Sequence, residues 1–280
     1  MVTVNTKYIL PHPILQPFMR CFAVRTFDTR DVSFPKAMIA DHEMTMIFFL
    51  HSQLFGFEAF NKNDSPYIIN QNSQCCFTGI LTSTKGFIIF KGPVTIVNIH
   101  FKPAGFFHIF NFSPKELVDK MDDNEKVLSN EILLIHEQML YAKNMGDCIN
   151  ILQRYLIKKL TSHKPRYKHS GIIGASELLL QYQGLYSITK LASECNITLQ
   201  TFEVQFEQQV GISPKYFSRL LRFANAVNMR LYNPTNNWTN VAHSCGYFDQ
   251  MHLIKDFKEF TTLSPKNFME VIHPPVENFV

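Results

Sequence analysis

The sequence predicts an α+β fold of more than one domain, with an antiparallel β barrel or sandwich in its N-terminal part and an all-helical C-terminal part. Three observations lead to this prediction. The 280 residues suffice for two domains, and 46% apolar with 18% charged residues suits a packed core. Short β-rich runs fill residues 1–112, and helical periodicity follows. Finally, two similar helical units lie near the C-terminus.

Composition narrows the class of protein. No apolar stretch reaches eighteen residues, and no basic segment precedes an apolar one at the N-terminus, so neither a transmembrane helix nor a signal peptide is expected. The six cysteines show no C-x-x-C spacing, which favours free thiols in a reducing cytoplasm over disulfides or zinc. A net charge of +4 permits nucleic-acid binding without arguing for it.

The first domain, residues 1–112, contains five runs that favour β-strands: 22–27, 44–50, 74–81, 86–90 and 95–101. In the last run Val97, Ile99 and Phe101 alternate with less apolar neighbours, which is typical of a half-buried strand. An antiparallel barrel or sandwich is therefore expected. The many Phe residues could line an apolar pocket, although core packing is their commoner use.

Catalytic patterns are missing from the sequence. It has no P-loop, dinucleotide fingerprint or G-x-S-x-G elbow, and no H-x-H pair of the kind a metal-dependent cupin uses. His42, His51, His100 and His108 are scattered along this half. We therefore expect no enzyme, no catalytic residue, no metal site and no cofactor, and ligand-binding residues cannot be assigned.

Residues 113–160 are expected to form a helical pair, 130–142 and 146–160. The second helix carries an apolar stripe of Ile149, Leu152, Leu156 and Leu160. Two interpretations stay open: the pair packs on the barrel, or it joins the same pair of a second copy in a homodimer. Residues 161–170 are polar and basic, with Lys164, Arg166 and Lys168, which favours a solvated linker over a phosphate contact.

An internal repeat occupies the last domain, residues 171–280. Leu191-Ala192-x-x-Cys195-Asn196-Ile197 aligns with Val241-Ala242-x-x-Cys245-Gly246-Tyr247 at an offset of 50 residues. Ile212-Ser213-Pro214-Lys215 aligns with Leu263-Ser264-Pro265-Lys266 at an offset of 51. The second copy therefore has one extra residue in its turn or at the start of its next helix.

Each copy has the features of a helix-turn-helix. Ala192 and Ala242 allow close helix crossing, and Asn196 and Gly246 suit a turn with positive φ. Phe202, Phe206, Leu253 and Phe257 are expected in the core. Residues 213–231 would form a connecting helix of roughly 28 Å, which could hold two reading heads about one duplex turn apart. A plain all-α bundle with two duplicated hairpins is the alternative.

Residues 171–272 resemble the tandem helix-turn-helix DNA-binding domain of AraC/XylS-type transcription regulators. The segment AHSCGYFDQMHLIKDFKEFTTLSPKNF closely follows the signature of that family. The resemblance implies a cytoplasmic bacterial regulator of transcription that binds double-stranded promoter DNA and is controlled by an N-terminal sensor and dimerisation domain, often cupin-like. A small-molecule effector, a homodimer and contact with RNA polymerase stay open, and no membrane partner is expected.

The resemblance also implies which residues contact DNA. The base-reading positions are Gln200, Thr201, Glu203, Val204, Gln250, Met251, Ile254 and Lys255. The expected phosphate contacts are Lys190, Ser213, Lys215, Lys258, Ser264 and Lys266. Arg222 matches a position expected to brace the two subdomains.

Two departures weaken the first reading head. Val204 stands where the family usually has Arg, whereas the second head has the conservative Lys255 at its matching position. Glu203 and Glu207 of the first head would also repel phosphates. We therefore expect the second head to dominate binding. Two other functions stay open: a protein-binding antagonist with weak or lost DNA binding, and an N-terminal ligand carrier or enzyme with an appended helical domain.

Overall fold

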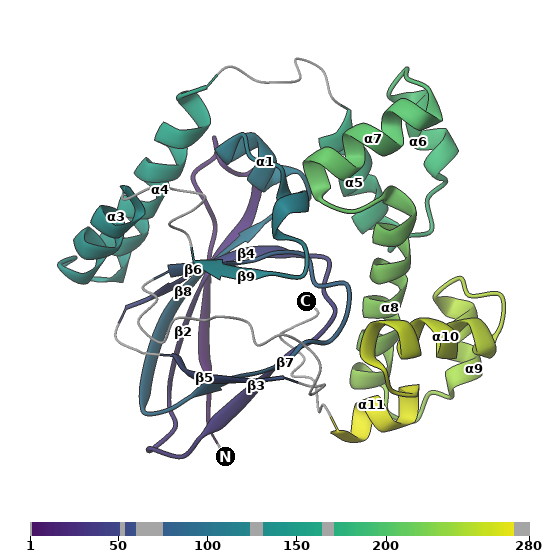
Figure 1. Ribbon diagram of the computed structural model, residues 1–280, viewed down its shortest axis with the longest axis horizontal. Coiled ribbons are helices and arrows are strands. Elements are labelled where there is room, and N and C mark those ends of the chain that lie inside the picture. The colour runs from purple at the N-terminus through teal and green to yellow at the C-terminus, as the bar shows by residue number, and fades with distance from the viewer. Residues whose placement is uncertain (1, 51–53, 60–74, 124–130, 164–170, 272–280) are drawn as a thin grey trace.

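The computed structural model describes residues 2–50, 54–59, 75–123, 131–163 and 171–271. A β-rich region and a group of helices lie side by side, and further helices cover the β-rich region at one end (Figure 1). The linker residues Lys164, Arg166 and Lys168 and the histidine His51 lie outside the described residues.

Two antiparallel sheets form the N-terminal part. The larger has, in spatial order, β1 (Asn5–Ile9), β2 (Met19–Asp28), β8 (Pro93–Phe101), β4 (Met44–Phe49), β6 (Cys75–Thr78) and β9 (Met121–Asp123). The smaller has β3 (Phe34–Met38), β7 (Gly86–Phe90) and β5 (Leu54–Ala59). All five predicted runs are strands. The described strands form a sandwich-like pair of sheets, and the larger sheet is not closed into a barrel.

The larger sheet is covered on both faces. Val97, Ile99 and Phe101 of β8 pack in one apolar cluster, whereas Ile96 packs in another with residues of the smaller sheet, such as Ile88 and Phe90. The prediction that β8 is half-buried was therefore wrong, because a second layer covers the face that was expected to meet solvent.

Helices cover the outer face of the larger sheet: α1 (Gly105–Phe110), the 3₁₀ turn η1 (Pro114–Leu117), α3 (Glu131–Leu140) and α4 (Met145–Thr161). Leu152 and Leu156 of α4 are fully buried and share a cluster with Phe106 and with sheet residues. Of the two interpretations left open, the structure therefore supports packing of the stripe on the sheet, since a dimer through the same stripe would have to uncover it.

The C-terminal part contains α5 (Ile172–Gln181), α6 (Ile188–Glu194), α7 (Leu199–Val210), α8 (Pro214–Tyr232), α9 (Trp238–Ser244), α10 (Gln250–Thr261) and α11 (Pro265–Val271). Helix α8 connects the unit around α7 with the unit around α10 (Figure 1). Ser213 caps α8 by accepting from Tyr216 N at 3.3 Å, and Pro214 occupies its first turn. Asn233 ends it.

The two helix-turn-helix units match the predicted repeat. Asn196 and Gly246 have φ of 56° and 71°, as the helix-ending turn requires. One residue separates Asn196 from the cap Thr198, and two separate Gly246 from the cap Asp249. The extra residue therefore lies in the second turn, where the side chain of Phe248 is 84% exposed.

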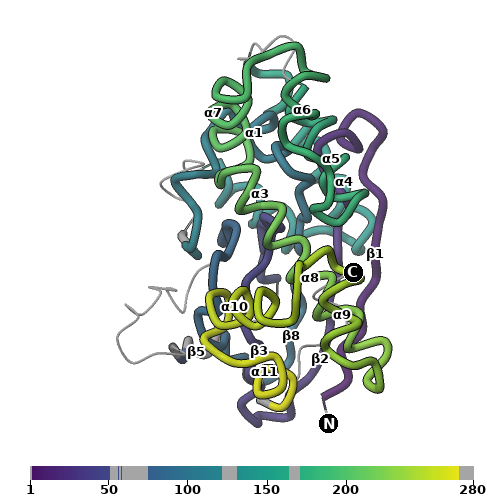
Figure 2. Tube along the Cα trace, turned by 90° about the vertical axis from the view of Figure 1, so that its right-hand side faces the viewer, coloured from purple at the N-terminus to yellow at the C-terminus, as the bar shows by residue number. Residues whose placement is uncertain are grey.

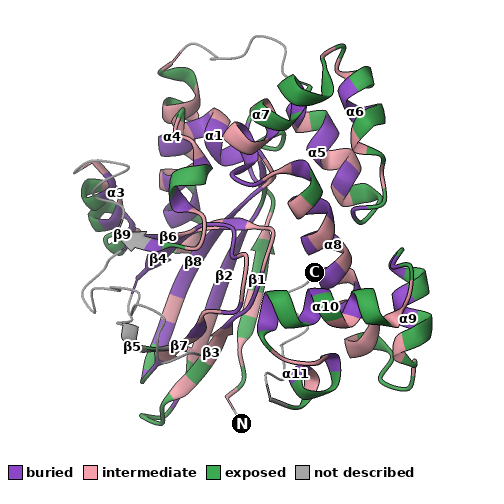
Figure 3. Ribbon diagram, turned by 45° about the vertical axis from the view of Figure 1, so that its right-hand side comes forward, coloured by how far each residue is buried: buried purple, intermediate pink, exposed green. Residues whose placement is uncertain are grey.

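An apolar cluster runs from one part of the molecule into the other. Ile39, Ala40 and Ile80 of the β-rich part belong to the same buried cluster as Phe206 and Phe217 of the helices. Figure 3 shows α8 and α10 beside the β-rich part, and in Figure 2 the same helices lie in front of its strands. The helix-turn-helix units are thus docked on the N-terminal part through buried apolar side chains.

Candidate nucleic-acid interface and ligand cavity

The predicted base-reading residues of the first unit lie together on the outer face of α7. Gln200, Thr201, Glu203 and Val204 are all exposed, and this face is open in Figure 3. The fully buried Phe202 and Phe206 fix the opposite face in the core, as predicted. Thr198 accepts from Thr201 N at 3.2 Å and so holds the first turn in place.

In the second unit Met251 and Lys255 are exposed on α10, and Gln250 and Ile254 are half-buried. Gln250 accepts a hydrogen bond from Thr239 of α9 at 2.9 Å, which orients its amide. The fully buried Leu253 and Phe257 hold the helix on its inner face. Each unit therefore presents a short row of polar and apolar side chains from one helix, the arrangement that reads base edges in a major groove.

A basic cleft lies beside α10. Its volume is about 530 Å³ and its lining includes Lys215, Arg222, Phe248, His252 and Lys255. The cleft brings together Lys215, predicted to contact phosphate, and Lys255, predicted to read bases. Lys258 and Lys266 are also exposed, although Lys266 lies 3.9 Å from the carboxylate of Glu270.

Two arginines of α8 hold α10 and the second turn. Arg219 contacts Asp256 at 2.7 Å and Glu259 at 2.5 Å. Arg222 donates to Gly246 O at 3.3 Å and lies over the ring of Tyr247, so it joins α8 to the second turn. Because its acidic partners bind it tightly, the pKa of Arg219 is raised further. Sequence reasoning did not assign Arg219, whose partners lie 37 and 40 residues away.

The predicted reading face of α7 carries less negative charge than the sequence indicates. Glu207 pairs with Lys115 of η1 at 2.6 Å and so faces the N-terminal part. Only Glu203 lies on the exposed reading face. Lys190 is 3.8 Å from Glu194 and lies over the ring of Tyr186. The ion pair with Lys115 therefore reduces the repulsion expected from Glu207, and Glu203 stays the acidic residue of the predicted reading face.

The serines Ser213 and Ser264 both begin helices. Ser264 accepts from Asn267 N at 3.3 Å at the start of α11. The start of α8 lies against the β-rich part, because Tyr216 donates to Thr82 O at 3.2 Å and the ring of Phe217 lies 6.0 Å from that of His42. A phosphate at Ser213 would therefore lie beside the N-terminal part.

A cavity of about 110 Å³ lies between the two sheets. Apolar side chains from both sheets line it, among them Ile47, Phe49, Leu81, Ile88, Phe90 and Ile96. The larger sheet also contributes the polar side chains of Arg25, Asn98 and His100, which are only 5–6% exposed. This cavity was not predicted from the sequence. The one sequence feature that pointed to it was Arg25, which lies in the mostly apolar predicted strand 22–27.

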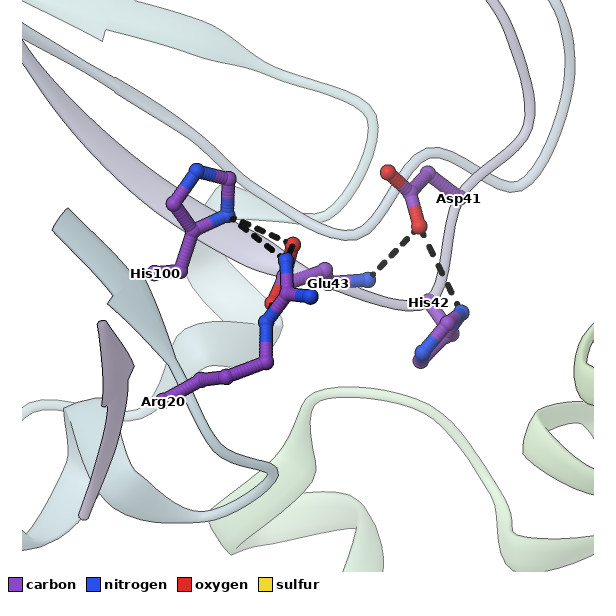
Figure 4. A network of polar contacts seen from close by, with 5 residues as sticks. All are labelled: Arg20, Asp41, His42, Glu43 and His100. Carbon is purple, nitrogen blue, oxygen red and sulfur yellow. Dashed lines mark hydrogen bonds and ion pairs between the residues drawn. The ribbon is translucent and has the colours of Figure 1, made fainter. Parts of the chain in front are cut away.

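An ionic network borders this cavity (Figure 4). Glu43 accepts from Arg20 at 2.9 Å and from Nδ1 of His100 at 2.7 Å. Burial raises the pKa of Glu43, but the hydrogen bond and charge of His100 and the charges of Arg20 and His42 outweigh it and lower the pKa to about 2. Asp41 accepts from Glu43 N at 3.1 Å and lies 3.4 Å from His42.

The pKa of Asp41 is shifted in the opposite direction to that of Glu43. Burial, opposed by the charge of His42, raises the pKa of the Asp41 carboxyl. The backbone of Asp41 pairs with Leu81, so this corner of the cavity joins the loops 39–43 and 80–85. Both loops contact α8 or α10: His42 packs on Phe217, and Thr84 N donates to Phe260 O at 2.7 Å.

Two helix-turn-helix units joined by one connecting helix form a tandem helix-turn-helix domain. Comparison with known families agrees: residues 191–270 match the model of a helix-turn-helix domain, and residues 7–122 match a domain of unknown function (DUF6597). The C-terminal part of this chain is thus an AraC/XylS-type helix-turn-helix domain, which confirms the resemblance seen in the sequence.

Relatives and solved structures are similar to the chain to different extents. Over 77 residues it is 30% identical to the transcriptional activator RhaS of Pectobacterium atrosepticum and to that of Pectobacterium carotovorum, a segment that spans 28% of this chain and 27% of either relative. ToxT of Vibrio cholerae O395, solved with a naphthalenyl-butenoic acid, has a TM-score of 0.44 at 10% identity and covers 97% of this chain and 99% of its own. Fatty-acid-bound ToxT of strain SCE256 has a TM-score of 0.42 at 11% identity, with 89% and 94% covered.

No helix within the described part of the chain is long and apolar enough to span a bilayer. All six cysteines are free thiols. Burial raises the pKa of Cys148 and of Cys245 to about 11, so these two thiols are poor nucleophiles near neutral pH.

Proposed function

We propose that the protein is a sequence-specific DNA-binding regulator of transcription whose N-terminal part controls the C-terminal domain. One observation carries this proposal. Helix α8, 19 residues long, connects two helix-turn-helix units whose predicted reading residues are exposed or half-buried. Its length of roughly 28 Å suits two recognition helices in neighbouring major grooves on one face of DNA. A protein-binding antagonist would not need two open reading faces.

Contacts between the two parts support control by the N-terminal part. Ser113 donates to Gln208 O at 2.9 Å, Lys115 pairs with Glu207, and Tyr216 donates to Thr82 O. These contacts hold both helix-turn-helix units, because α7 belongs to one and α8 to both. A small-molecule effector bound in the cavity between the sheets could change the loops that contact α8 and thereby the spacing of the reading heads.

DNA binding is tested by fluorescence anisotropy with duplexes from the promoter upstream of the gene and a scrambled duplex of equal composition. We expect Lys255→Ala to weaken specific binding by about 1–3 kcal/mol, because it removes a base contact. Val204→Ala should change little. Lys143→Ala, an exposed lysine beyond α3, is the matched control for lost charge.

The outcome decides between a regulator and an antagonist. A wild-type protein that binds promoter and scrambled duplexes equally weakly at low salt would favour the antagonist. If Lys255→Ala binds like wild type while changes at Gln200 and Val204 abolish binding, the first unit is the dominant head.

A further inference from the structure

The cavity between the sheets contains a buried positive charge whose Nη1 has no acceptor. Arg25 lies on β2, is 6% exposed and lines the cavity. Its Nη1 has no hydrogen-bond partner, and among the described residues the guanidinium forms no ion pair. A buried charge without a partner is strongly unfavourable, so its presence needs a counterpart.

The carboxylates that border the cavity already have partners. Glu43 accepts from both Arg20 and His100, and Asp41 accepts from Glu43 N and lies beside His42 (Figure 4). Moving Glu43 to Arg25 would break two charge-assisted contacts of 2.9 Å and 2.7 Å. A negative group for Arg25 must therefore come from another molecule.

Two further polar atoms of the cavity indicate which functional groups the ligand has. Oδ1 of Asn98 and Nε2 of His100 line the same cavity, are buried and have no partner. Nδ1 of His100 donates to Glu43, which leaves Nε2 as the nitrogen free for a ligand. Oδ1 of Asn98 can only accept a hydrogen bond, so its partner on the ligand must be a donor such as a hydroxyl or amino group.

Most of the remaining lining is apolar, although Lys36, Thr45 and Thr78 also contribute to it, and the space is small. The cavity measures about 110 Å³, whereas an apolar cavity of about 150 Å³ holds benzene. We propose that the cavity binds a small organic monocarboxylate with a compact apolar body, its carboxylate paired with Arg25 and a hydroxyl or amino group donating to Asn98. Only the ligand's role as an effector rests on the proposed function; the binding itself is inferred from the cavity.

Binding is measured without DNA, by isothermal titration calorimetry and thermal unfolding of the full chain. The probes are isovalerate and 2-hydroxyisocaproate, each compared with its primary amide, which has the same shape and no charge. We expect saturable binding of at least one acid, with the matching amide and the Arg25→Met protein roughly tenfold weaker or worse. Arg154→Gln, on the exposed side of α4, should bind like wild type.

Arg25→Met should also unfold at a higher temperature than wild type without ligand, because it removes an unpaired buried charge. The comparison of acid with amide on wild-type protein needs no variant, so it decides the question even if Arg25→Met misfolds. Equal binding of amides, preference for inorganic phosphate, or failure of every acid to bind would overturn the proposal. Loss of DNA binding alone would overturn the proposed function and leave this site intact.

Discussion

At the scale of single residues, the buried Arg25 and the partly buried Arg219 have opposite surroundings. Arg219 has two carboxylates within 2.7 Å, those of Asp256 and Glu259, and lies against the rings of Tyr216 and Phe260. Arg25 has an Nη1 with no acceptor. The first arrangement stabilises a fold, whereas the second costs stability and suits a binding site. The difference predicts opposite effects of removing each charge.

Arg219→Ala should destabilise the C-terminal domain by about 2 kcal/mol, because it leaves the nearly buried Asp256 without its cation. Trp238, the single tryptophan of the chain, lies in α9 and reports unfolding of this domain by its fluorescence. Arg154→Ala is the control, since Arg154 is exposed on α4. A urea midpoint equal to that of wild type would show that the ion pairs contribute nothing.

Glu203 is the acidic residue on the reading face of α7. Glu203→Gln should raise the affinity for a scrambled duplex, because it removes one repulsion from the phosphates. Titrations at several salt concentrations between about 50 and 200 mM separate this effect from base reading, because only a phosphate-linked term depends on salt. Glu207→Gln should have a smaller effect, since Glu207 pairs with Lys115. An equal gain for both variants would contradict this assignment.

At the scale of elements, the C-terminal domain was predicted most completely. Helix α8, its caps and the buried faces of α7 and α10 follow from local spacing, and the extra residue of the second repeat proved to be Phe248. The five predicted strands are all present. The strands that were not predicted include β1 and β3, which lie at sheet edges. Their sequences, NTKYI and FPKAM, contain polar residues or proline and so lack the apolar, β-branched pattern that predicts a strand.

The site between the sheets could not be predicted for a different reason. Arg20, Glu43 and His100 meet only because β2 and β4 both pair with β8, with Cys21 and Thr45 opposite His100. Neither the pairing nor its register can be read from a single sequence. The short helix α1, GFFHIF, was also missed, because six residues rich in aromatic side chains favour a strand as much as a helix.

The stripe of α4 leads to a prediction at this scale. Leu152→Glu together with Leu156→Glu should unfold the N-terminal part, because each would place a carboxylate in a fully buried position at a cost of several kcal/mol. Leu134→Glu is the control, since Leu134 on α3 is 59% exposed. Circular dichroism with thermal unfolding and sedimentation distinguish the outcomes. A double variant that keeps the wild-type midpoint and only loses self-association would restore the dimer interpretation.

At the scale of the whole molecule, the two parts form one docked unit. The apolar cluster containing Ile39 and Ile80 continues into the helix-turn-helix core, and hydrogen bonds surround it. The same loops 39–43 and 80–85 border the cavity and contact α8 and α10. A ligand that moves these loops therefore acts on both reading heads, which links the proposed ligand site to the proposed regulation.

His108 allows this docking to be tested by pH. Its Nε2 lies 3.1 Å from Oε1 of Gln209 on α7, so the nitrogen donates to an amide oxygen across the interface. Burial lowers the pKa of His108 below its usual 6.5, against the raising effect of the Gln209 bond, and the neighbouring His163 lowers it further. The unfolded chain therefore binds a proton at higher pH than the folded protein does.

The folded state buries His108 in its neutral form, so the associated stability is present above about pH 6.5 and is lost as the pH falls through the lower pKa of the folded state. The free energy of unfolding, measured in urea by the fluorescence of Trp238, should thus decrease between about pH 7.5 and pH 5. His108→Gln keeps a donor for Gln209 but cannot titrate, so its dependence on pH should be weaker over the same range. Because the two proteins differ at residue 108 alone, the difference between their slopes measures the contribution of His108. Identical slopes for the two proteins would mean that protonation of His108 has no influence on the docked state.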